Sequence, residues 1–139
     1  MKIDKNKKED KIKEIEQFLE ELEGVLPQDL KIYKNDFKIR DICERHFEKT
    51  VEAVVDLAFI TIREKNLKSP EEDKQSFEIL ASSNIISGKL SKKLQEAKGI
   101  RNIIAHEYGK INDELVFEAV TEKLIPDIRE FLNNIKSNK

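Results

Sequence analysis

The sequence predicts an all-α fold, an up-and-down bundle of about four to five helices. Apolar residues recur at three- and four-residue steps over most of the chain, which is the spacing of one helical face. Only 4 Gly and 3 Pro leave little turn chemistry for an all-β fold, in which turns recur about every 8–12 residues. The 139 residues suffice for one domain with a hydrophobic core, so residues 1–139 are expected to form a single helical domain.

The first expected helix follows a polar start. Residues 1–10 are polar and lysine-dense, which predicts a frayed lead-in. The helix itself is indicated by apolar residues on one face, and Gly24 and Pro27 are expected to end it. That face comprises Ile12, Ile15, Phe18, Leu19 and Leu22.

A long second helix is expected because no Gly or Pro lies between Asp29 and Ser69. Its apolar residues recur about every 3.5 positions, the repeat of a seam between packed helices. Cys43, within this stripe, is predicted to be a small buried hydrophobe rather than a reactive thiol. His46 lies beside the stripe and is predicted to be structural or exposed rather than catalytic. The seam comprises Ile39, Ile42, Cys43, Phe47, Val51, Val54, Ala58 and Ile62.

A shorter third helix is expected after a break at Ser69 and Pro70. Pro70 and the acids that follow it, residues 71–73, resemble a helix start, because acids suit the positive end of the helix dipole. The pair Ser87-Gly88 predicts the next break. The apolar residues of this helix are Phe77, Ile79, Leu80 and Ala81.

Two further helices complete the bundle. One is expected from about Lys89 to Tyr108, where Gly109 stops it. The last begins near Asn112 or Asp113, either of which can cap it. Pro126 is expected to bend or restart this last helix. Its apolar face comprises Leu115, Val116, Ala119, Val120, Leu124, Ile128 and Leu132.

Charge and cysteine content exclude several classes of protein. The balance of 26 basic against 28 acidic residues, a net charge of -2, excludes a broad basic clamp for nucleic acid and an acidic tail. Cys43 is the only cysteine, so neither an intrachain disulfide nor a Cys-rich zinc site can form. No apolar run approaches the roughly 18 residues of a membrane span, and the start lacks a signal-peptide core. We expect a soluble, cytoplasmic protein without a membrane partner.

The expected helix from Lys89 carries chemical groups on two sides. At 100° per residue, Arg101 falls at about 20°, inside the apolar stripe centred on Leu90. A guanidinium there is costly unless it is paired or faces a ligand or cleft. His106 falls at about 160°, near Asn102, so a straight helix does not place it beside Arg101. The two could converge through the reach of arginine, a distortion near Gly109 or a second subunit.

A plain structural interpretation of these residues stays open at this point. Arg101 could pair with a buried carboxylate, Tyr108 could be an aromatic at the edge of the core, and His106 could be a surface residue.

The stretch from Gly99 to Tyr108 has the pattern R-N-x-x-x-H-x-Y, formed by Arg101, Asn102, His106 and Tyr108. This pattern resembles the signature of the HEPN superfamily, and specifically that of the HepT-like toxins of prokaryotic HEPN/MNT toxin–antitoxin modules. The resemblance extends over residues 29–135. It departs after the motif, where the family commonly has Tyr-x-x-Ile-Asp and this chain has Asn as the last of those residues. Asn caps a helix as Asp does, so the difference is minor.

This resemblance implies a metal-independent endoribonuclease that acts as a homodimer, with the two motifs facing each other across the dimer axis. His106 is then expected to be the catalytic acid or base, since histidine can take or give a proton near neutral pH. Arg101 is expected to bind the scissile phosphate, and Asn102 to orient the imidazole or the phosphate. Tyr108 is expected to be adenylylated by a partner MNT-type nucleotidyltransferase, the antitoxin. The resemblance implies no metal and no other cofactor.

Two alternatives to a ribonuclease toxin are kept. A non-catalytic HEPN module that binds nucleotide or partners a nucleotidyltransferase would keep the fold and the dimer without cleaving RNA. A generic helical interaction protein would tolerate substitution of Arg101 and His106. The net charge does not exclude RNA binding at a small cleft, because lysines flank the motif. These are Lys89, Lys92, Lys93, Lys98 and Lys110.

Overall fold

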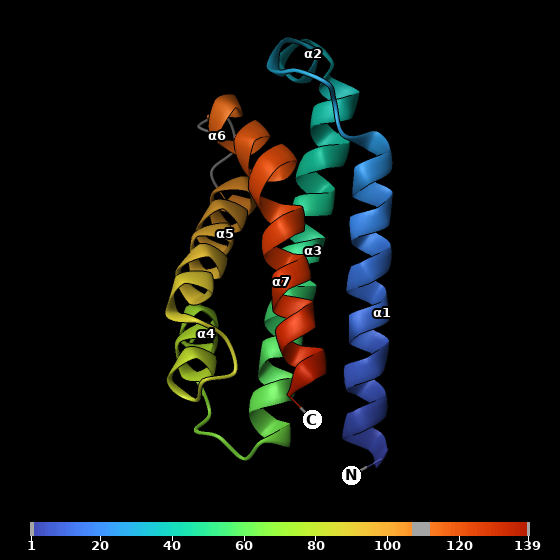
Figure 1. Cartoon of the computed structure of the whole chain (residues 1–139). Helices are drawn as coiled ribbons and strands as arrows, with labels where there is room; N and C mark the ends of the chain where they lie inside the picture. Colours follow the sequence, from blue (N-terminus) through green and yellow to red (C-terminus); the bar gives the residue numbers. More distant parts are fainter. Residues whose placement is uncertain (1, 107–111, 139) are drawn as a thin grey trace.

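The computed structural model describes residues 2–106 and 112–138, and all the regular structure in these ranges is helical. Helix α1 (Lys2–Val25) runs the length of the molecule, and the short α2 (Leu30–Asn35) lies at the top of the molecule in the view of Figure 1. The chain then returns along α3 (Phe37–Glu64), antiparallel to α1 (Figure 1). The prediction of an all-α, up-and-down bundle is confirmed within these ranges.

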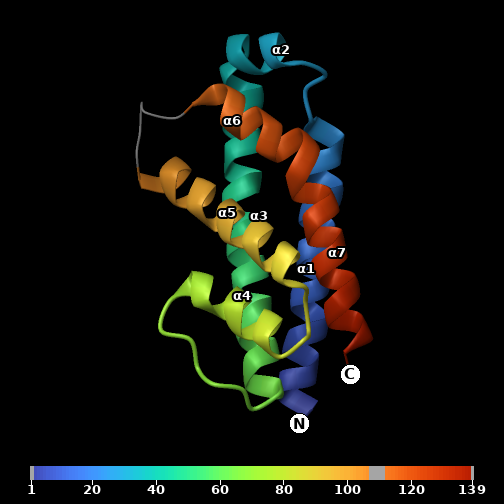
Figure 2. The same ribbon diagram turned by 60° about the vertical axis from the view of Figure 1, so that its left-hand side comes forward.

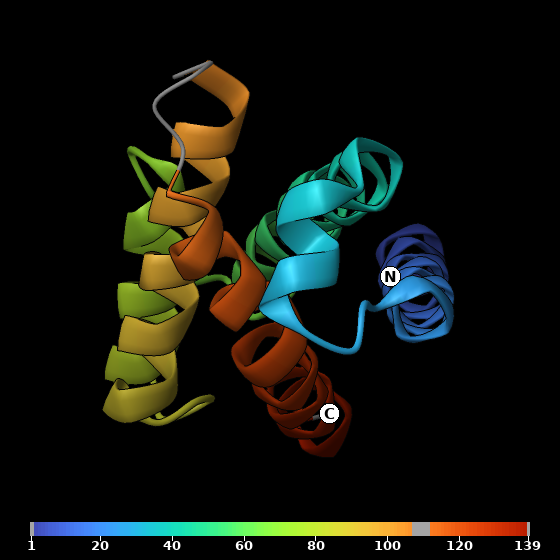
Figure 3. The same cartoon turned by 90° about the horizontal axis from the view of Figure 1, so that it is seen from above.

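The second half of the chain packs on the other side of α3. Helices α4 (Asp73–Ser82) and α5 (Gly88–His106) form a hairpin that lies obliquely across α3 (Figure 2). Then α6 (Asp113–Glu118), the π-helical turn η1 (Ala119–Lys123) and α7 (Leu124–Ser137) run on as one continuous helix. Seen from above, α3 and α7 separate α1 from the α4–α5 pair (Figure 3). The helix that carries the motif is therefore at the periphery of the bundle.

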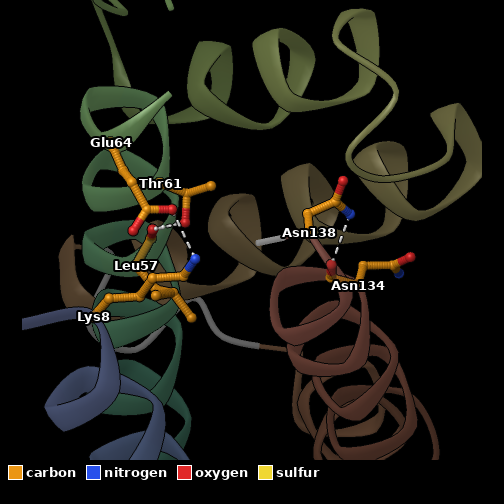
Figure 4. A network of polar contacts seen from close by, with 6 residues as sticks. All are labelled: Lys8, Leu57, Thr61, Glu64, Asn134 and Asn138. Carbon is orange, nitrogen blue, oxygen red and sulfur yellow. Dashed lines mark hydrogen bonds and ion pairs between the residues drawn. The ribbon is translucent and has the colours of Figure 1, made fainter. Parts of the chain in front are cut away.

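The beginning of α1 corrects one expectation. Residues 2–10, expected to be a frayed lead-in, are helical. Lys8 donates from Nζ to Glu64 Oε1 at 2.9 Å, which ties α1 to the end of α3 near the last residues of α7 (Figure 4). The predicted apolar face of α1 is confirmed, since its members are buried except for the partly buried Phe18. Lys49 Nζ of α3 lies 4.7 Å from the centre of the Phe18 ring.

The expectation of one long helix after Asp29 is wrong in its first part. The chain interrupts at Asp36, which is extended and accepts hydrogen bonds at its Oδ1 from the amides of Lys38 and Ile39. Asp29 caps α2 in the same way, through the amide of Ile32. An aspartate that binds free amides can start a helix without help from Gly or Pro. The predicted seam of α3 is otherwise buried or partly buried, apart from Ile42, which is 42% exposed.

The α4–α5 hairpin is closed by residues at the helix ends. Helix α4 begins at Asp73, three residues after the predicted start at Pro70. Asn66 and Asn84 follow the ends of α3 and α4 in the left-handed conformation, with φ of 56° and 60°, where Asn is among the best tolerated residues. Ser87 confirms the predicted break, because its Oγ accepts a hydrogen bond from the amide of Leu90 at 3.0 Å.

The last helix begins and bends as predicted. Asn112 caps it, and its Oδ1 accepts from the amides of Glu114 and Leu115. The bend comes just before Pro126, where the amide of Leu124 bonds to the carbonyl of Ala119 in the wide turn of a π-helix. The predicted apolar face is buried except for Leu115, which is 40% exposed. Of the helices described, none is both long enough and apolar enough to cross a bilayer.

Candidate functional site

Helix α5 is buried on one narrow side only. Its buried residues are Leu90, Ser91, Leu94, Lys98 and Ile104. One of these five is a lysine, and α5 carries three of the motif residues, Arg101, Asn102 and His106, in its last two turns. The helix therefore buries only a few apolar side chains, and it places charged groups on the side that faces α3 and α4.

Arg101 is paired. Its Nη2 lies 3.0 Å from Oε2 of Glu52, which comes from α3, and 23% of its side chain is exposed. Its Nε is buried and has no hydrogen-bond partner among the described residues. Arg101 is therefore paired with a carboxylate, as considered from the sequence, but that carboxylate is partly exposed and not buried. Because the Glu52 side chain is 48% exposed, the pair lies at the edge of the core, where a ligand could reach it.

Lys98 extends this pair into a cluster. Its side chain is only 8% exposed, and its Nζ lies 2.9 Å from Oδ2 of Asp73 and 3.9 Å from Oε2 of Glu52. A buried ammonium needs such partners, because desolvation disfavours an isolated charge. Lys74 is also close, since a Cβ at Gly99 would lie 3.6 Å from its Nζ. The cationic side chains of Lys74, Lys98 and Arg101 therefore gather around the middle of α5.

Glu52 and Asp73 are the members of this cluster that sequence reasoning missed. Both precede α5 by many residues and reach it only through the packing of α3 and α4. The one available signal was the costly position of Arg101 in an apolar stripe, which indicates that an acid must come from another helix.

The structure keeps Arg101 and His106 apart within one chain. His106 is exposed and is the last residue of α5, and Asn102 is partly buried one turn before it. The helix is regular through these positions, so the two motif residues face different sides, as the 100° rotation per residue predicts. Tyr108 lies outside the described residues.

A groove runs beside the motif, between α5 and the α6–η1–α7 helix, with a volume of about 830 Å³. Ile100 and Ile103 of α5 form one wall, and Leu115 and Pro126 lie opposite. At its rim, Lys93 Nζ lies 3.6 Å from Asp127 Oδ1. Burial raises the pKa of Asp127 above its ordinary value, although Lys93 acts in the opposite direction. The groove offers an apolar surface that continues toward His106.

Cys43 and His46 are placed as predicted, away from the motif. Cys43 is buried, and burial raises the pKa of its thiol to about 11, so the reactive thiolate is scarce at neutral pH. His46 contacts the carbonyl of Ile42 through Nδ1 and lies 3.6 Å from Glu21 of α1. Among the described residues, no three His, Cys, Asp or Glu side chains are grouped as metal ligands would be.

Both the sequence and the fold of this chain are similar to those of known proteins. The sequence model of the HepT-like ribonuclease family matches residues 10–135. The chain is 32% identical over 105 residues to the mRNA nuclease HepT of Shewanella oneidensis, an alignment that covers 76% of this chain and 78% of that protein.

Solved structures with the same fold include toxin–antitoxin complexes. One, a toxin–antitoxin with AMP-PNP, superposes with a TM-score of 0.86 at 29% identity and covers 94% of this chain and 97% of that one. Another, the tri-AMPylated HEPN toxin of Shewanella oneidensis in complex with its MNT antitoxin, has the same TM-score and identity and covers 94% and 96%. The cytosolic protein YutE of Bacillus subtilis, at 14% identity and a TM-score of 0.81, covers 96% and 88% and shares the fold alone.

Proposed function

The chain belongs to the HepT-like ribonuclease family, and from that premise we propose that it is a metal-independent endoribonuclease toxin. The observation that carries the proposal is the placement of the motif on α5. Arg101 is held at the edge of the core by a partly exposed carboxylate, and His106 is exposed one and a half turns further on. An anchored guanidinium suits the binding of a phosphate, and an exposed imidazole suits proton transfer.

The proposed reaction needs two proton transfers. The 2′-oxygen of the RNA attacks phosphorus and loses its proton to a base, while the 5′-oxygen leaves with a proton from an acid. The products are a 2′,3′-cyclic phosphate and a free 5′-hydroxyl. Arg101 would stabilise the charge on the phosphoryl oxygens in the transition state, and Asn102, one turn before His106, would orient the imidazole or the phosphate.

One chain supplies a single motif histidine, so we propose that the site is completed by a second copy of the chain. The groove beside α5 supports this arrangement, because its apolar wall continues along the helix toward His106. A two-fold pairing over this wall would bring two copies of His106 to one site. Ile103→Glu is expected to give a monomer with little cleavage, whereas Ile32→Glu, on the partly exposed face of α2, is expected to keep the dimer. Light scattering after gel filtration measures the oligomeric state of both variants.

The decisive test of catalysis compares the two histidines. His106→Ala should lower RNA cleavage by about 100-fold or more, the usual share of a general acid or base, while the fold and the dimer persist. His46→Ala is the matched control and should leave cleavage unchanged, because its side chain faces Glu21 of α1. Full cleavage by His106→Ala would refute the assignment.

For Tyr108 we propose modification by an MNT-type nucleotidyltransferase antitoxin. The related Shewanella toxin is tri-AMPylated in complex with its MNT antitoxin, which supports a similar partner here. The phenol oxygen would attack the α-phosphorus of ATP, pyrophosphate would leave, and the phenol proton would pass to a base. The added negative charge would repel RNA from Arg101. Mass spectrometry after co-expression tests this: neutralisation without AMP on Tyr108 would indicate simple occlusion.

The second candidate is a non-catalytic HEPN module, which is favoured by one observation, the neutralisation of Arg101 by Glu52. Such a module would show no cleavage and no effect of His106→Ala on toxicity. We further infer a cytoplasmic location, where the RNA substrate is found, and a single domain over residues 1–139. Limited proteolysis that released a stable fragment would contradict the latter.

A further inference from the structure

Arg101 shares its counter-ion with a second cation. Oε2 of Glu52 lies 3.0 Å from Nη2 of Arg101 and 3.9 Å from Nζ of Lys98. The two cations lie three residues apart on α5, so they are neighbours on the helix surface, and the carboxylate reaches them from α3. One carboxylate oxygen therefore serves two positive groups from different distances.

The three side chains differ in how exposed they are. Lys98 is 8% exposed and is fixed by its second partner, Asp73, at 2.9 Å. Arg101 is 23% exposed, and Glu52 is 48% exposed. Glu52 is thus the most exposed of the three side chains, and its 3.9 Å distance to Lys98 can shorten to that of a direct ion pair. Among the described residues, the Arg101 guanidinium forms an ion pair only with Glu52.

The donors of Arg101 are also incompletely used. Its buried Nε has no hydrogen-bond partner among the described residues, while Nη2 is taken by Glu52. The Nε–H and one Nη2–H point along the same edge of a guanidinium, where a carboxylate or a phosphate binds with two oxygens. An RNA phosphate that used this edge would have to displace the Glu52 oxygen.

We propose that Glu52 is an exchangeable counter-ion that holds Arg101 in the free protein and passes to Lys98 when an RNA phosphate takes Arg101. This inference rests on the proposed function, because it concerns the phosphate-binding residue of that site. Lys98 makes the exchange possible: a displaced carboxylate that found no cation would be left desolvated and unpaired, at a large cost in free energy. Glu52 and Lys98 are positioning residues in this scheme, and no covalent bond changes.

The first experiment measures binding of a short, single-stranded 2′-O-methyl RNA, which lacks the attacking hydroxyl, by fluorescence anisotropy. Glu52→Gln removes the competing charge and should tighten binding about 3- to 10-fold, and with cleavable RNA it should lower KM more than it changes kcat. Lys98→Met should weaken binding by a similar factor, because Glu52 then has no second cation. Lys98→Arg, which keeps a cation, should restore binding.

The double variant distinguishes exchange from a merely structural role. In the Glu52→Gln background, Lys98→Met should no longer weaken binding, because this background has no Glu52 carboxylate that Lys98 would have to stabilise. Circular dichroism confirms that each variant is folded. Two controls remove similar charges elsewhere. One is Glu48→Gln, one turn away from Glu52 on α3, and the other is Lys136→Met on α7, because the Nζ of Lys136 pairs with Glu16 of α1 at 3.2 Å. Both should leave binding unchanged. Weaker or unchanged binding by Glu52→Gln, or an effect of Lys98→Met that persists in the double variant, would overturn the proposal.

The second experiment needs no RNA and therefore separates this proposal from the proposed function. Phenylglyoxal modifies accessible guanidinium groups, and peptide mapping reports the rate at Arg101 alone. The rate should rise several-fold in Glu52→Gln and fall in Lys98→Met, in which Glu52 has only Arg101 to bind. If these rates change as expected while no variant and no wild-type protein binds or cleaves RNA, the ribonuclease function fails, and only the sharing of Glu52 between Arg101 and Lys98 stands. Equal rates in all three proteins would refute the exchange whatever the RNA experiments show.

Discussion

The two sides of α3 place their charges differently. Toward α1 the interface is largely apolar, with residues such as Ile15 and Leu22 fully buried. Its ion pairs are partly exposed, with the Lys8 side chain 11% and the Lys11 side chain 22% exposed. Toward α5 the cation of Lys98 is itself buried and shares Glu52 with Arg101. Burying charge costs desolvation that apolar packing avoids, so the α1 side is built for stability. The α5 side gives up part of that stability to hold charged groups in fixed positions.

The largest expected effect is on the apolar side. Ile15→Ala should lower the free energy of unfolding by about 3 kcal/mol, through lost burial and the cavity it leaves. Cleavage per folded molecule should not change, because α1 is separated from α5 by α3 and α7 (Figure 3). Urea denaturation measures the free energy of unfolding. An activity assay at urea concentrations below the unfolding transition measures cleavage per folded molecule. Val25→Ala, at the exposed end of α1, is the control, and an equal loss there would contradict the comparison.

On the charged side, Asp73→Asn should cost about 1–2 kcal/mol, because it leaves the buried Lys98 with the more distant Glu52 alone. The cost is below that of a fully buried pair, since the Asp73 side chain is 40% exposed. The exposed neighbour Glu72 provides the control, and Glu72→Gln should change stability little. Denaturation curves that coincide for both variants would show that Lys98 does not depend on Asp73.

Glu44 of α3 provides a test on a partly buried acid whose negative charge is stabilised little by neighbouring cations. Burial, and next the charge of Asp41, raise the pKa of Glu44 above its ordinary value of 4.5. Its ionised form therefore destabilises the folded state, and the stability that the neutral form provides is lost as the pH rises through the raised pKa. Glu44→Gln should raise Tm at pH 7 by on the order of 1–2 °C. Below the ordinary pKa the difference should vanish, and a gain that persisted there would indicate a cause other than charge.

The smallest effect is expected at the edge of the α1–α3 interface. Lys11 Nζ lies 3.4 Å from both Glu14 and Asp56, and all three side chains contact solvent. Lys11→Met should change the free energy of unfolding by less than about 0.5 kcal/mol, because exposed ion pairs are screened. Chemical denaturation at low and high salt measures it. A loss as large as that of Asp73→Asn would remove the distinction between the two sides of α3.

Much of the fold could be predicted because it depends on local spacing. The apolar faces of α1 and of the last helix, the break at Ser87, the cap at Asn112 and the bend before Pro126 follow from residues close in sequence. The break at Asp36 was missed, since an aspartate inside an apolar repeat does not reveal whether its carboxylate binds backbone amides. The helical residues 2–10 were missed for a related reason: their polar composition conceals the contact of Lys8 with Glu64.

For the site, the sequence by itself determined the motif, its place at the end of one helix and the separation of Arg101 from His106 around that helix. Family membership follows from the sequence as well. Only the tertiary structure decided what Arg101 contacts, because Glu52 and Asp73 lie on other helices and approach α5 through packing alone. A helix's own periodicity indicates which side chains need partners, but the partners depend on how three helices cross. The Glu52–Lys98–Arg101 arrangement is therefore a property of the folded bundle.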